Sequence, residues 1–312
     1  MWVQDVPDGG VRALAFTPDG GTLYTRDAAR WVTAWDTQNH TGRRVFRAGA
    51  THHPPLAEPG FGLADCGRFL VADGLPPCVF DCRTGAVVPF NTGGLRRDNP
   101  NKPAEPIEVS AGIGLIHADP FAPRLLALLP SGVVATWNLG TRRPGPDLSP
   151  PVSQVFHERF HLTPFGQAIL RHNKPDRVSV FDAAAGGFVA TFTVRCPSPY
   201  FEPLPAPDGR AAVLFCGRQL FLWARATQTL RGKPIPASPP SGAIAFHPTE
   251  PVFTALNGDK VLTLFNLDTG APIRSLDFAL GKKVQCVAFS PDGLTCAVGG
   301  SNKQFAVFDV DL

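Results

Sequence analysis

A repeat of roughly forty residues constrains the fold of this chain more than any other feature. Its clearest landmark is an aromatic residue, followed by Asp, Asn or Ala, at the end of a run with β-type alternation. The landmark occurs seven times, with spacings of 45, 57, 44, 42, 42 and 43 residues, at Trp35, Phe80, Trp137, Phe181, Trp223, Phe265 and Phe308. The seven units account for all 312 residues, so we expect a single domain spanning residues 1–312.

Each unit has the same predicted order of strands and turns. A short apolar strand leads into a Pro/Gly turn, as in "VRALAFTPDGGTL" from Val11 and "VQCVAFSPDGLTC" from Val284. A second strand, a polar turn, the strand with the aromatic landmark and a fourth strand follow. Four short antiparallel strands cannot bury both faces alone, so such units stack radially. The sequence therefore predicts an all-β, seven-bladed β-propeller of four-stranded antiparallel blades.

The turn sequences at Phe16–Gly20 and Phe289–Gly293, together with the aromatic-Asp/Asn strand ends, resemble the WD40-repeat family. The resemblance extends over essentially the whole chain, although the family's Gly-His dipeptide does not occur in it. It implies a non-catalytic platform whose loops bind a peptide or a protein. It also implies that the N-terminus completes the last blade. We therefore expect residues 2–6 to form an outer strand beside residues 306–310.

The segment "HERFH", from His157 to His161, matches the H-E-x-x-H motif of zinc peptidases. That motif requires a helix, where residues four apart rise about 6 Å and share a face, whereas on a strand they lie about 13 Å apart. Alignment of Gly166 with Gly20 places the segment in the opening strand of the fourth unit. We therefore predict a strand here and no zinc site.

The seven cysteines contain no C-x-x-C pair, which is unlike a disulfide framework or a zinc knuckle. We expect reduced thiols and no cofactor, with one alternative, a metal held by Cys66, Cys78 and Cys82 together with His52 or His53. Nucleotide-binding glycine motifs are also missing from the sequence.

The net charge of +3 is small for this length and gives no reason to expect a nucleic-acid partner. The N-terminus lacks a basic stretch followed by an apolar run, and the sequence has no run of 18 apolar residues. We expect a cytoplasmic protein that is monomeric alone and does not contact a membrane.

The turns between the second and third strands of the units carry a net charge of +4, which exceeds that of the whole chain. A basic set of loops favours an acidic or phosphorylated protein segment as partner. The predicted partner-binding residues in these turns are Arg26, Arg30, Arg171, His172, Lys174, Arg177, Arg218, Lys260 and Lys303.

The 57-residue spacing places an insert at about residues 91–108, which is polar and rich in proline. We expect disorder in its middle, or a partner-binding arm that uses Arg96 and Arg97. The function we expect is a protein-interaction scaffold. The alternative is a propeller hydrolase or lyase with a polar or metal site at the central channel.

Overall fold

The structure is a computed structural model of the chain. It describes residues 1–48, 61–64, 66–72, 78–88, 97–99, 102–107, 115–118, 123–128, 134–141, 143–144, 156–162, 167–172, 177–182, 187–193, 201–206, 209–227, 229–237, 244–257, 261–277 and 283–311. The regular structure of these residues is β-strand throughout, and every strand pairing within them is antiparallel. The prediction of an all-β chain is therefore confirmed.

The chain divides into two compact units. Unit 1 comprises Met1–Arg47, His53–Glu58 and Cys196–Leu312, and unit 2 comprises Ala48–His52 and Pro59–Arg195. The described strands form seven four-stranded sheets and one two-stranded ribbon. Four of the four-stranded sheets belong to unit 1, and three belong to unit 2 with the ribbon.

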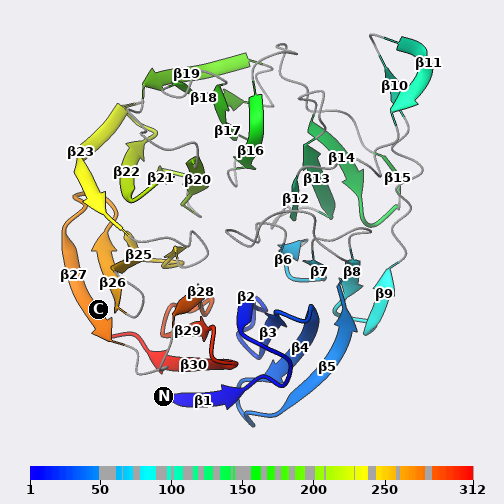
Figure 1. The fold of residues 1–312 in the computed structure, drawn as a ribbon, viewed down its shortest axis with the longest axis vertical. Helices are drawn as coiled ribbons and strands as arrows, with labels where there is room; N and C mark the ends of the chain where they lie inside the picture. Colours follow the sequence, from blue (N-terminus) through cyan, green and yellow to red (C-terminus); the bar gives the residue numbers. More distant parts are fainter. Residues whose placement is uncertain are drawn as a thin grey trace. The chain divides into compact units, whose positions relative to one another are not determined.

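The four sheets of unit 1 follow the predicted order of strands along the chain (Figure 1). They are the first sheet, β2 (Val11–Phe16), β3 (Thr22–Asp27), β4 (Trp31–Asp36) and β5 (Gly42–Arg47); the sheet of β20 (Phe201–Pro205), β21 (Ala211–Cys216), β22 (Gln219–Ala224) and β23 (Thr229–Pro236); the sheet of β24 (Ala245–Phe246), β25 (Val252–Asn257), β26 (Val261–Asn266) and β27 (Pro272–Asp277); and the closing sheet, β28 (Val284–Phe289), β29 (Thr295–Gly300), β30 (Gln304–Asp309) and β1 (Trp2–Asp5).

The N-terminal strand β1 completes the closing sheet. It lies antiparallel to β30, with Trp2 opposite Val307 and Asp5 opposite Gln304. The chain ends thus meet in one sheet (Figure 1). This confirms the expected pairing of the N-terminal segment with the last aromatic strand.

Apolar side chains hold the sheets of unit 1 face to face. Phe215 and Leu222 pack with Phe253 between the sheets β20–β23 and β24–β27. Leu256 and Leu262 pack with closing-sheet residues such as Val298, and the closing sheet in turn packs on the first sheet. Each inner sheet of this stack therefore buries apolar residues on both faces, as the apolar pattern of the strands requires.

The aromatic landmarks all lie in the third strand of their sheet, one residue before its end. The following Asp or Asn caps the next turn, because its side-chain oxygen accepts backbone N–H bonds. Asp36 Oδ1 accepts from Asn39 at 2.8 Å, and Asn266 Oδ1 accepts from Thr269 at 2.8 Å. This capping supplies a physical reason for the aromatic-Asp/Asn pattern.

The Pro-Asp-Gly turns are closed by their own side chains. The Ser290 hydroxyl donates to Asp292 Oδ1 at 2.5 Å and accepts the Thr295 N–H at 2.9 Å. Thr17 makes the same two bonds in the first sheet, to Asp19 at 2.6 Å and from Thr22 at 2.9 Å. The first residue of each turn is thus fixed by local hydrogen bonding.

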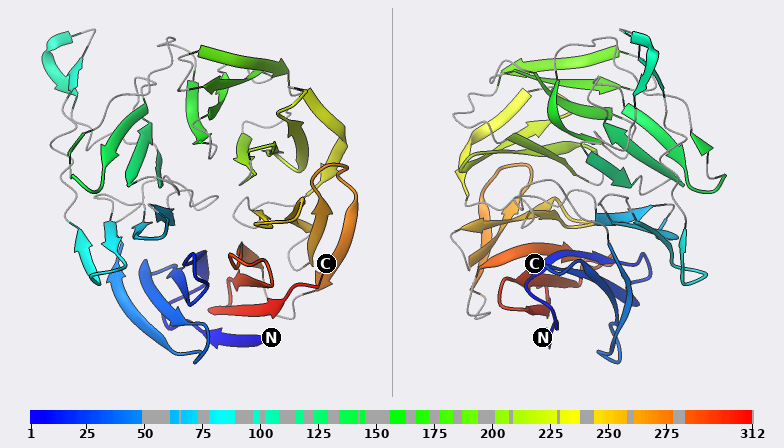
Figure 2. Two further views of the ribbon diagram at one scale, coloured as in Figure 1. Left: turned by 180° about the vertical axis from the view of Figure 1, so that it is seen from behind. Right: turned by 45° about the vertical axis from the view of Figure 1, so that its right-hand side comes forward.

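Unit 2 contains three sheets of the same order and a separate ribbon (Figure 2). The sheets are β6 (Phe61–Ala64), β7 (Phe69–Ala72), β8 (Cys78–Asp81) and β9 (Ala86–Val88); β12 (Leu115–Ala118), β13 (Arg124–Leu128), β14 (Val134–Asn138) and β15 (Arg143–Pro144); and β16 (Phe156–Leu162), β17 (Gln167–His172), β18 (Arg177–Asp182) and β19 (Gly187–Thr193). The ribbon pairs β10 (Arg97–Asn99) with β11 (Lys102–Ile107).

Two sequence predictions concern these strands. The "HERFH" segment lies in β16, so the strand prediction is confirmed and the helical context of a zinc peptidase is ruled out. The expectation of disorder inside the insert is wrong for residues 97–99 and 102–107, because they pair as the ribbon. Figures 1 and 2 show this ribbon projecting away from the four-stranded sheets of its unit.

Candidate functional site

The turns of unit 1 lie at two opposite ends of its sheets. Antiparallel order places the first-to-second turns at one end and the second-to-third turns at the other. At the first end, His247 contacts Gly293 of the neighbouring sheet, and a Cβ on Gly20 would lie 3.8 Å from Pro291. Corresponding turns of neighbouring sheets therefore lie next to each other, so that the sheets of unit 1 share a common orientation. The predicted partner-binding turns belong to the opposite end.

Two of these turns, residues 28–30 and 301–303, lie side by side. The link between β1 and β2 joins them, since the Ala28 N–H donates to the Gly10 carbonyl at 2.9 Å, while a Cβ on Gly10 would come 2.8 Å from the Ser301 backbone. The Val6 N–H also donates to the Lys303 carbonyl at 2.6 Å. Gly10 thus allows a backbone approach that larger residues would prevent.

Both three-residue turns hold a basic residue in the left-handed backbone region. Arg30 has φ of 71° and Lys303 has φ of 70°. Residues other than glycine rarely adopt this region, and the strain amounts to roughly 1 kcal/mol or more. In the sheet β20–β23 a glycine, Gly217 with φ of 62°, precedes the exposed Arg218. The basic side chains at Arg30 and Lys303 are therefore kept at positions where glycine would be relaxed.

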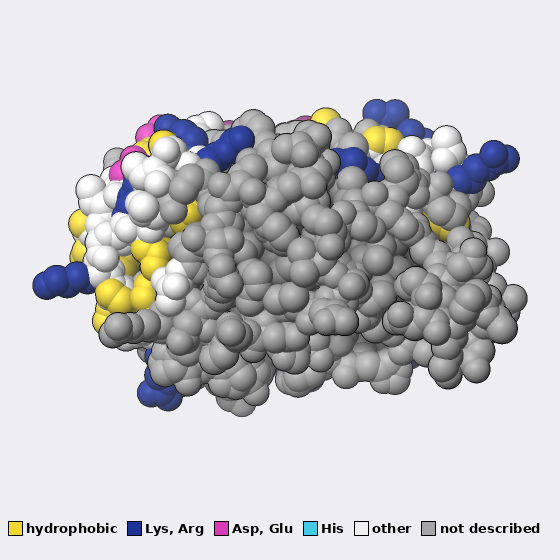
Figure 3. Space-filling view, turned by 90° about the horizontal axis from the view of Figure 1, so that it is seen from above, with side chains coloured by type: hydrophobic (Ala, Val, Ile, Leu, Met, Phe, Trp, Pro, Cys, Tyr) yellow, Lys and Arg dark blue, Asp and Glu magenta, His cyan; other side chains and the backbone are white. Residues whose placement is uncertain are grey.

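Arg30, Arg218 and Lys303 are at least partly accessible to solvent, whereas a fourth predicted partner-binding residue, Arg26, is not. Lys303 and Arg218 are exposed and Arg30 is half-buried, and Figure 3 shows described Lys and Arg side chains projecting from the surface. Arg26 was expected in the same exposed loop, but it lies in β3 with 1% of its surface exposed. That expectation is wrong, because β3 continues to Asp27 and turns Arg26 into the interior.

The loop expected at residues 171–177 is shorter than predicted, because the flanking strands include its end residues. Arg171 and His172 end β17, and Arg177 begins β18, so these three residues lie in strands and not in a loop. Arg97 lies in β10 of the ribbon. Lys174, Lys260 and Arg96 fall outside the described residues. The candidate site therefore comprises Arg30 and Lys303, which lie in adjacent turns, and Arg218. Arg218 lies in the corresponding turn of the sheet β20–β23, which packs on the sheet β24–β27 and, among the described residues, not on the sheets of the other two residues.

Sequence reasoning missed a cluster next to Arg30. The guanidinium carbon of Arg44 lies 4.9 Å from the ring centroid of Trp31, and that of Arg47 lies 5.9 Å from it. Arg44 also forms an ion pair with Asp8. A β-bulge in β5 brings the two arginines to Trp31. The sequence "GRRVFR" contains no residue pattern that predicts this bulge.

Asp27 closes the turn that carries Arg30. Its Oδ1 accepts the Trp31 N–H at 2.8 Å, and only 1% of the residue is exposed. Burial is the main cause that raises the pKa of this carboxyl, and the backbone hydrogen bond opposes it. The second oxygen has no hydrogen-bond partner among the described residues. The role of Asp27 is therefore to shape the turn, because its buried carboxyl accepts a backbone hydrogen bond across it.

The opposite end of unit 1 holds a small pocket of about 70 Å³, lined by Arg210, His247 and Glu250 among others. His247 is buried, and both of its ring nitrogens bond to the backbone. Nδ1 accepts the Glu250 N–H at 2.9 Å, and Nε2 faces the Gly293 carbonyl at 3.1 Å. A histidine held this way supports structure, and its nitrogens are not available to a substrate.

The cysteines do not form a metal site in the part of the chain that the structure describes. Across the described parts of the chain, His, Cys, Asp and Glu residues do not gather in groups of three that could hold a metal ion. Cys66 is exposed and Cys78 and Cys82 are half-buried, while His52 and His53 fall outside the description. The expectation of reduced thiols is wrong for Cys216, which is disulfide-bonded.

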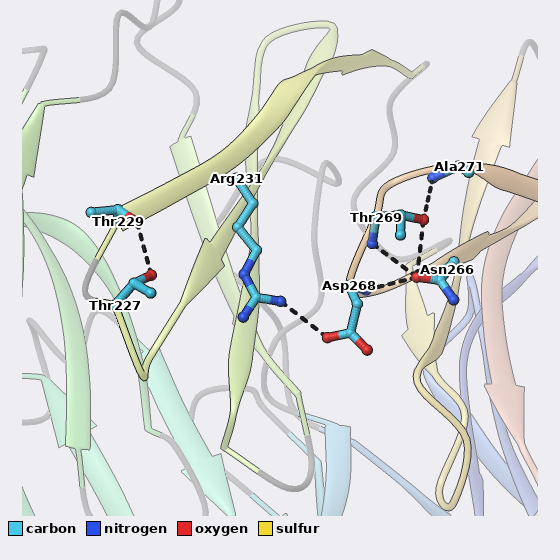
Figure 4. Close-up of polar contacts among 7 residues, drawn as sticks. All are labelled: Thr227, Thr229, Arg231, Asn266, Asp268, Thr269 and Ala271. Carbon is cyan, nitrogen blue, oxygen red and sulfur yellow. Dashed lines mark hydrogen bonds and ion pairs between the residues drawn. The ribbon is translucent and has the colours of Figure 1, made fainter.

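The outer strands make hydrogen bonds between neighbouring sheets, and the same type of contact recurs from one sheet to the next. Arg231 of β23 donates to Asp268 Oδ1 at 3.0 Å, in the turn between β26 and β27 (Figure 4). Arg274 of β27 donates to the Asp311 carbonyl at 3.2 Å, and Gln4 of β1 donates to the His40 carbonyl at 3.1 Å. In each case the last strand of one sheet bonds to the segment that follows the third strand of the next.

The described part of the chain contains no helix that is long and apolar enough to cross a membrane. Comparison of the chain with models of protein families finds no match, and comparison with curated proteins finds none either.

Proposed function

We propose that the chain is a WD40-like, seven-bladed β-propeller that acts as a non-catalytic protein-interaction scaffold. Three observations support the fold. The aromatic landmarks recur in the third strand of each four-stranded sheet, the sheets of unit 1 stack face to face, and β1 completes the closing sheet. Radial stacking of this kind protects sheet faces and edges.

The observation that carries the function is the pair of strained basic residues, Arg30 and Lys303, in adjacent turns. Non-glycine residues held in this backbone region are enriched at functional sites. Together with Arg218, they favour an acidic or phosphorylated segment of a partner protein. A membrane or nucleic-acid partner is not part of the proposal, and neither is a cofactor.

The propeller-enzyme alternative has less support. Catalytic acids, bases and nucleophiles need side chains that can reach a substrate, yet His247 uses both ring nitrogens for backbone bonds. The cytoplasmic location also loses support, because disulfides such as that of Cys216 persist mainly in oxidising compartments.

The test is capture of partners from a native extract, read by mass spectrometry. The wild type is compared with Arg30→Glu/Arg218→Glu/Lys303→Glu. A matched control reverses three exposed cations on the last strands of sheets, Arg43→Glu/Lys233→Glu/Arg274→Glu. We expect a partner that the wild type and the control retain and that the turn variant loses. Equal capture by all three would contradict the proposed site, and capture of no partner would contradict the scaffold function.

A further inference from the structure

A bulge in the outer strand β5 places two arginines on one face. Arg47 lies opposite Trp31, and Arg44 lies opposite Thr33, so Val45 between them has no partner in the pairing with β4. In a regular strand, residues three apart point to opposite faces. The extra residue shifts the alternation, and both arginines therefore lie on the face of Trp31.

The arginines are held over the indole ring. Their guanidinium carbons lie 4.9 Å (Arg44) and 5.9 Å (Arg47) from the ring centroid of Trp31. Arg47 Nε also donates to the Ala29 carbonyl at 3.2 Å. An aromatic face orients a guanidinium and leaves its edge available for bidentate binding of a carboxylate.

A carboxylate of the protein itself already occupies part of this cluster. Asp8, in the link between β1 and β2, forms an ion pair with Arg44, and the two side chains are 42% and 39% exposed. An exposed pair of this kind contributes little stability, so Arg44 can exchange Asp8 for another carboxylate. Since Arg30 lies beside Trp31, the positive charges at this place outnumber the single exposed acid.

We propose that Trp31, Arg44 and Arg47 bind an acidic peptide segment of a partner protein, and that a carboxylate of this segment displaces Asp8 from Arg44. The inference rests on the proposed scaffold function and names a partner chemistry and a second binding surface. A peptide is favoured over nucleic acid because the cluster is compact, whereas binding of a polynucleotide depends on many phosphate contacts.

The test uses fluorescein-labelled octaglutamate as the probe, with octaglutamine as its uncharged control, and reads binding by fluorescence anisotropy. The site variant is Arg44→Gln/Arg47→Gln. Arg43→Gln is the matched control, because Arg43 is exposed on the same strand but lies opposite Ala34, on the other face. Asp8→Asn removes the internal competitor and leaves the arginines in place. Circular dichroism and thermal unfolding check that each variant is folded.

We expect the wild type to bind octaglutamate and not octaglutamine. The affinity should fall about tenfold or more in the double variant, stay within about twofold in Arg43→Gln, and rise about threefold in Asp8→Asn. Unchanged affinity in a folded double variant, or equal binding of octaglutamine, would overturn the proposal. The proposal would also be overturned if octathymidylate bound more tightly than octaglutamate and the double variant lost this binding.

The two proposals can fail separately. If octaglutamate binds as expected but extract capture yields no partner, the scaffold function fails while the anion-binding chemistry of the cluster holds. If capture succeeds but octaglutamate does not bind, the scaffold function holds and the acidic-peptide site is wrong.

Discussion

The imidazole Nε2 of His247 lies 3.1 Å from the carbonyl oxygen of Gly293, which belongs to the neighbouring sheet. Nδ1 of the same ring accepts the backbone N–H of Glu250 at 2.9 Å, so Nε2 is the nitrogen that donates. His247 takes the place that Ser290 and Thr17 hold in their own turns. One side chain therefore closes its own turn and joins two sheets.

We predict that Gly293→Ala destabilises the protein by about 2 kcal/mol or more. Gly293 has φ of 75°, and a Cβ there would lie 2.3 Å from ring atoms of His247. Urea unfolding followed by circular dichroism measures the loss. In the background of His247→Ser the same change should cost clearly less, because the ring is gone and a serine hydroxyl can accept the turn N–H. Equal losses in both backgrounds would contradict the contact.

The stability of the Pro-Asp-Gly turns should depend on pH in the acid range. Hydrogen bonds from Thr17 and then from the Gly21 backbone lower the pKa of Asp19, and bonds from Ser290 and then from the Leu294 backbone lower that of Asp292, from the ordinary value of 3.8. A lowered folded-state pKa stabilises the protein above the unfolded-state value, and this contribution is lost as pH falls through the folded-state value.

Asp19→Asn/Asp292→Asn should therefore be less stable than the wild type at neutral pH, with a difference that shrinks below the ordinary pKa of 3.8. Urea unfolding at a series of pH values tests this. A difference that stays constant from neutral to strongly acidic pH would contradict the expected role of the two carboxylates.

Removal of residues 1–7 should lower the melting temperature by several degrees. The deletion takes away β1, leaves β30 as an open edge, and removes Val6 and Trp2 from the core between the closing sheet and the first sheet. The stacking of Trp2 on His40, with ring centroids 4.5 Å apart, is lost as well. An unchanged melting curve by differential scanning calorimetry would mean that β1 does not hold the sheet closed.

The ion pair between Arg231 and Asp268 should contribute little by itself. Their side chains are 35% and 61% exposed, and exposed pairs typically contribute about 0.2–1 kcal/mol. A double-mutant cycle with Arg231→Ala and Asp268→Ala should give a coupling energy in this range that decreases in high salt. A coupling of several kcal/mol would show that this outer-strand contact does more than the geometry suggests.

Most of the strand order could be read from the sequence because it depends on local chemistry. The aromatic landmarks and the Pro-Asp-Gly turns carry their own hydrogen bonds, so Trp35 and Ser290 appear in the expected strand and turn. The strand at "HERFH" followed from alignment with another unit. The pairing of β1 with β30 followed from the resemblance to the WD40-repeat family, which implies that the N-terminus completes the last blade.

The site was less predictable, because it depends on where strands end and where side chains turn. β3 extends far enough to bury Arg26, and β17 and β18 include residues that the charge pattern had placed in a loop. The bulge at Val45 decides which arginines meet Trp31, and strand alternation alone would have separated Arg44 from Arg47. Such shifts of a single residue leave no mark in composition or period.

The most direct test of the scaffold function is calorimetric titration of a captured and purified partner into the wild type and into Arg30→Glu/Arg218→Glu/Lys303→Glu. We predict saturable one-to-one binding by the wild type and an affinity at least about tenfold weaker in the variant, with unchanged thermal unfolding. Equal affinities in two equally folded proteins would contradict the account, because the basic turns would then take no part in recognition.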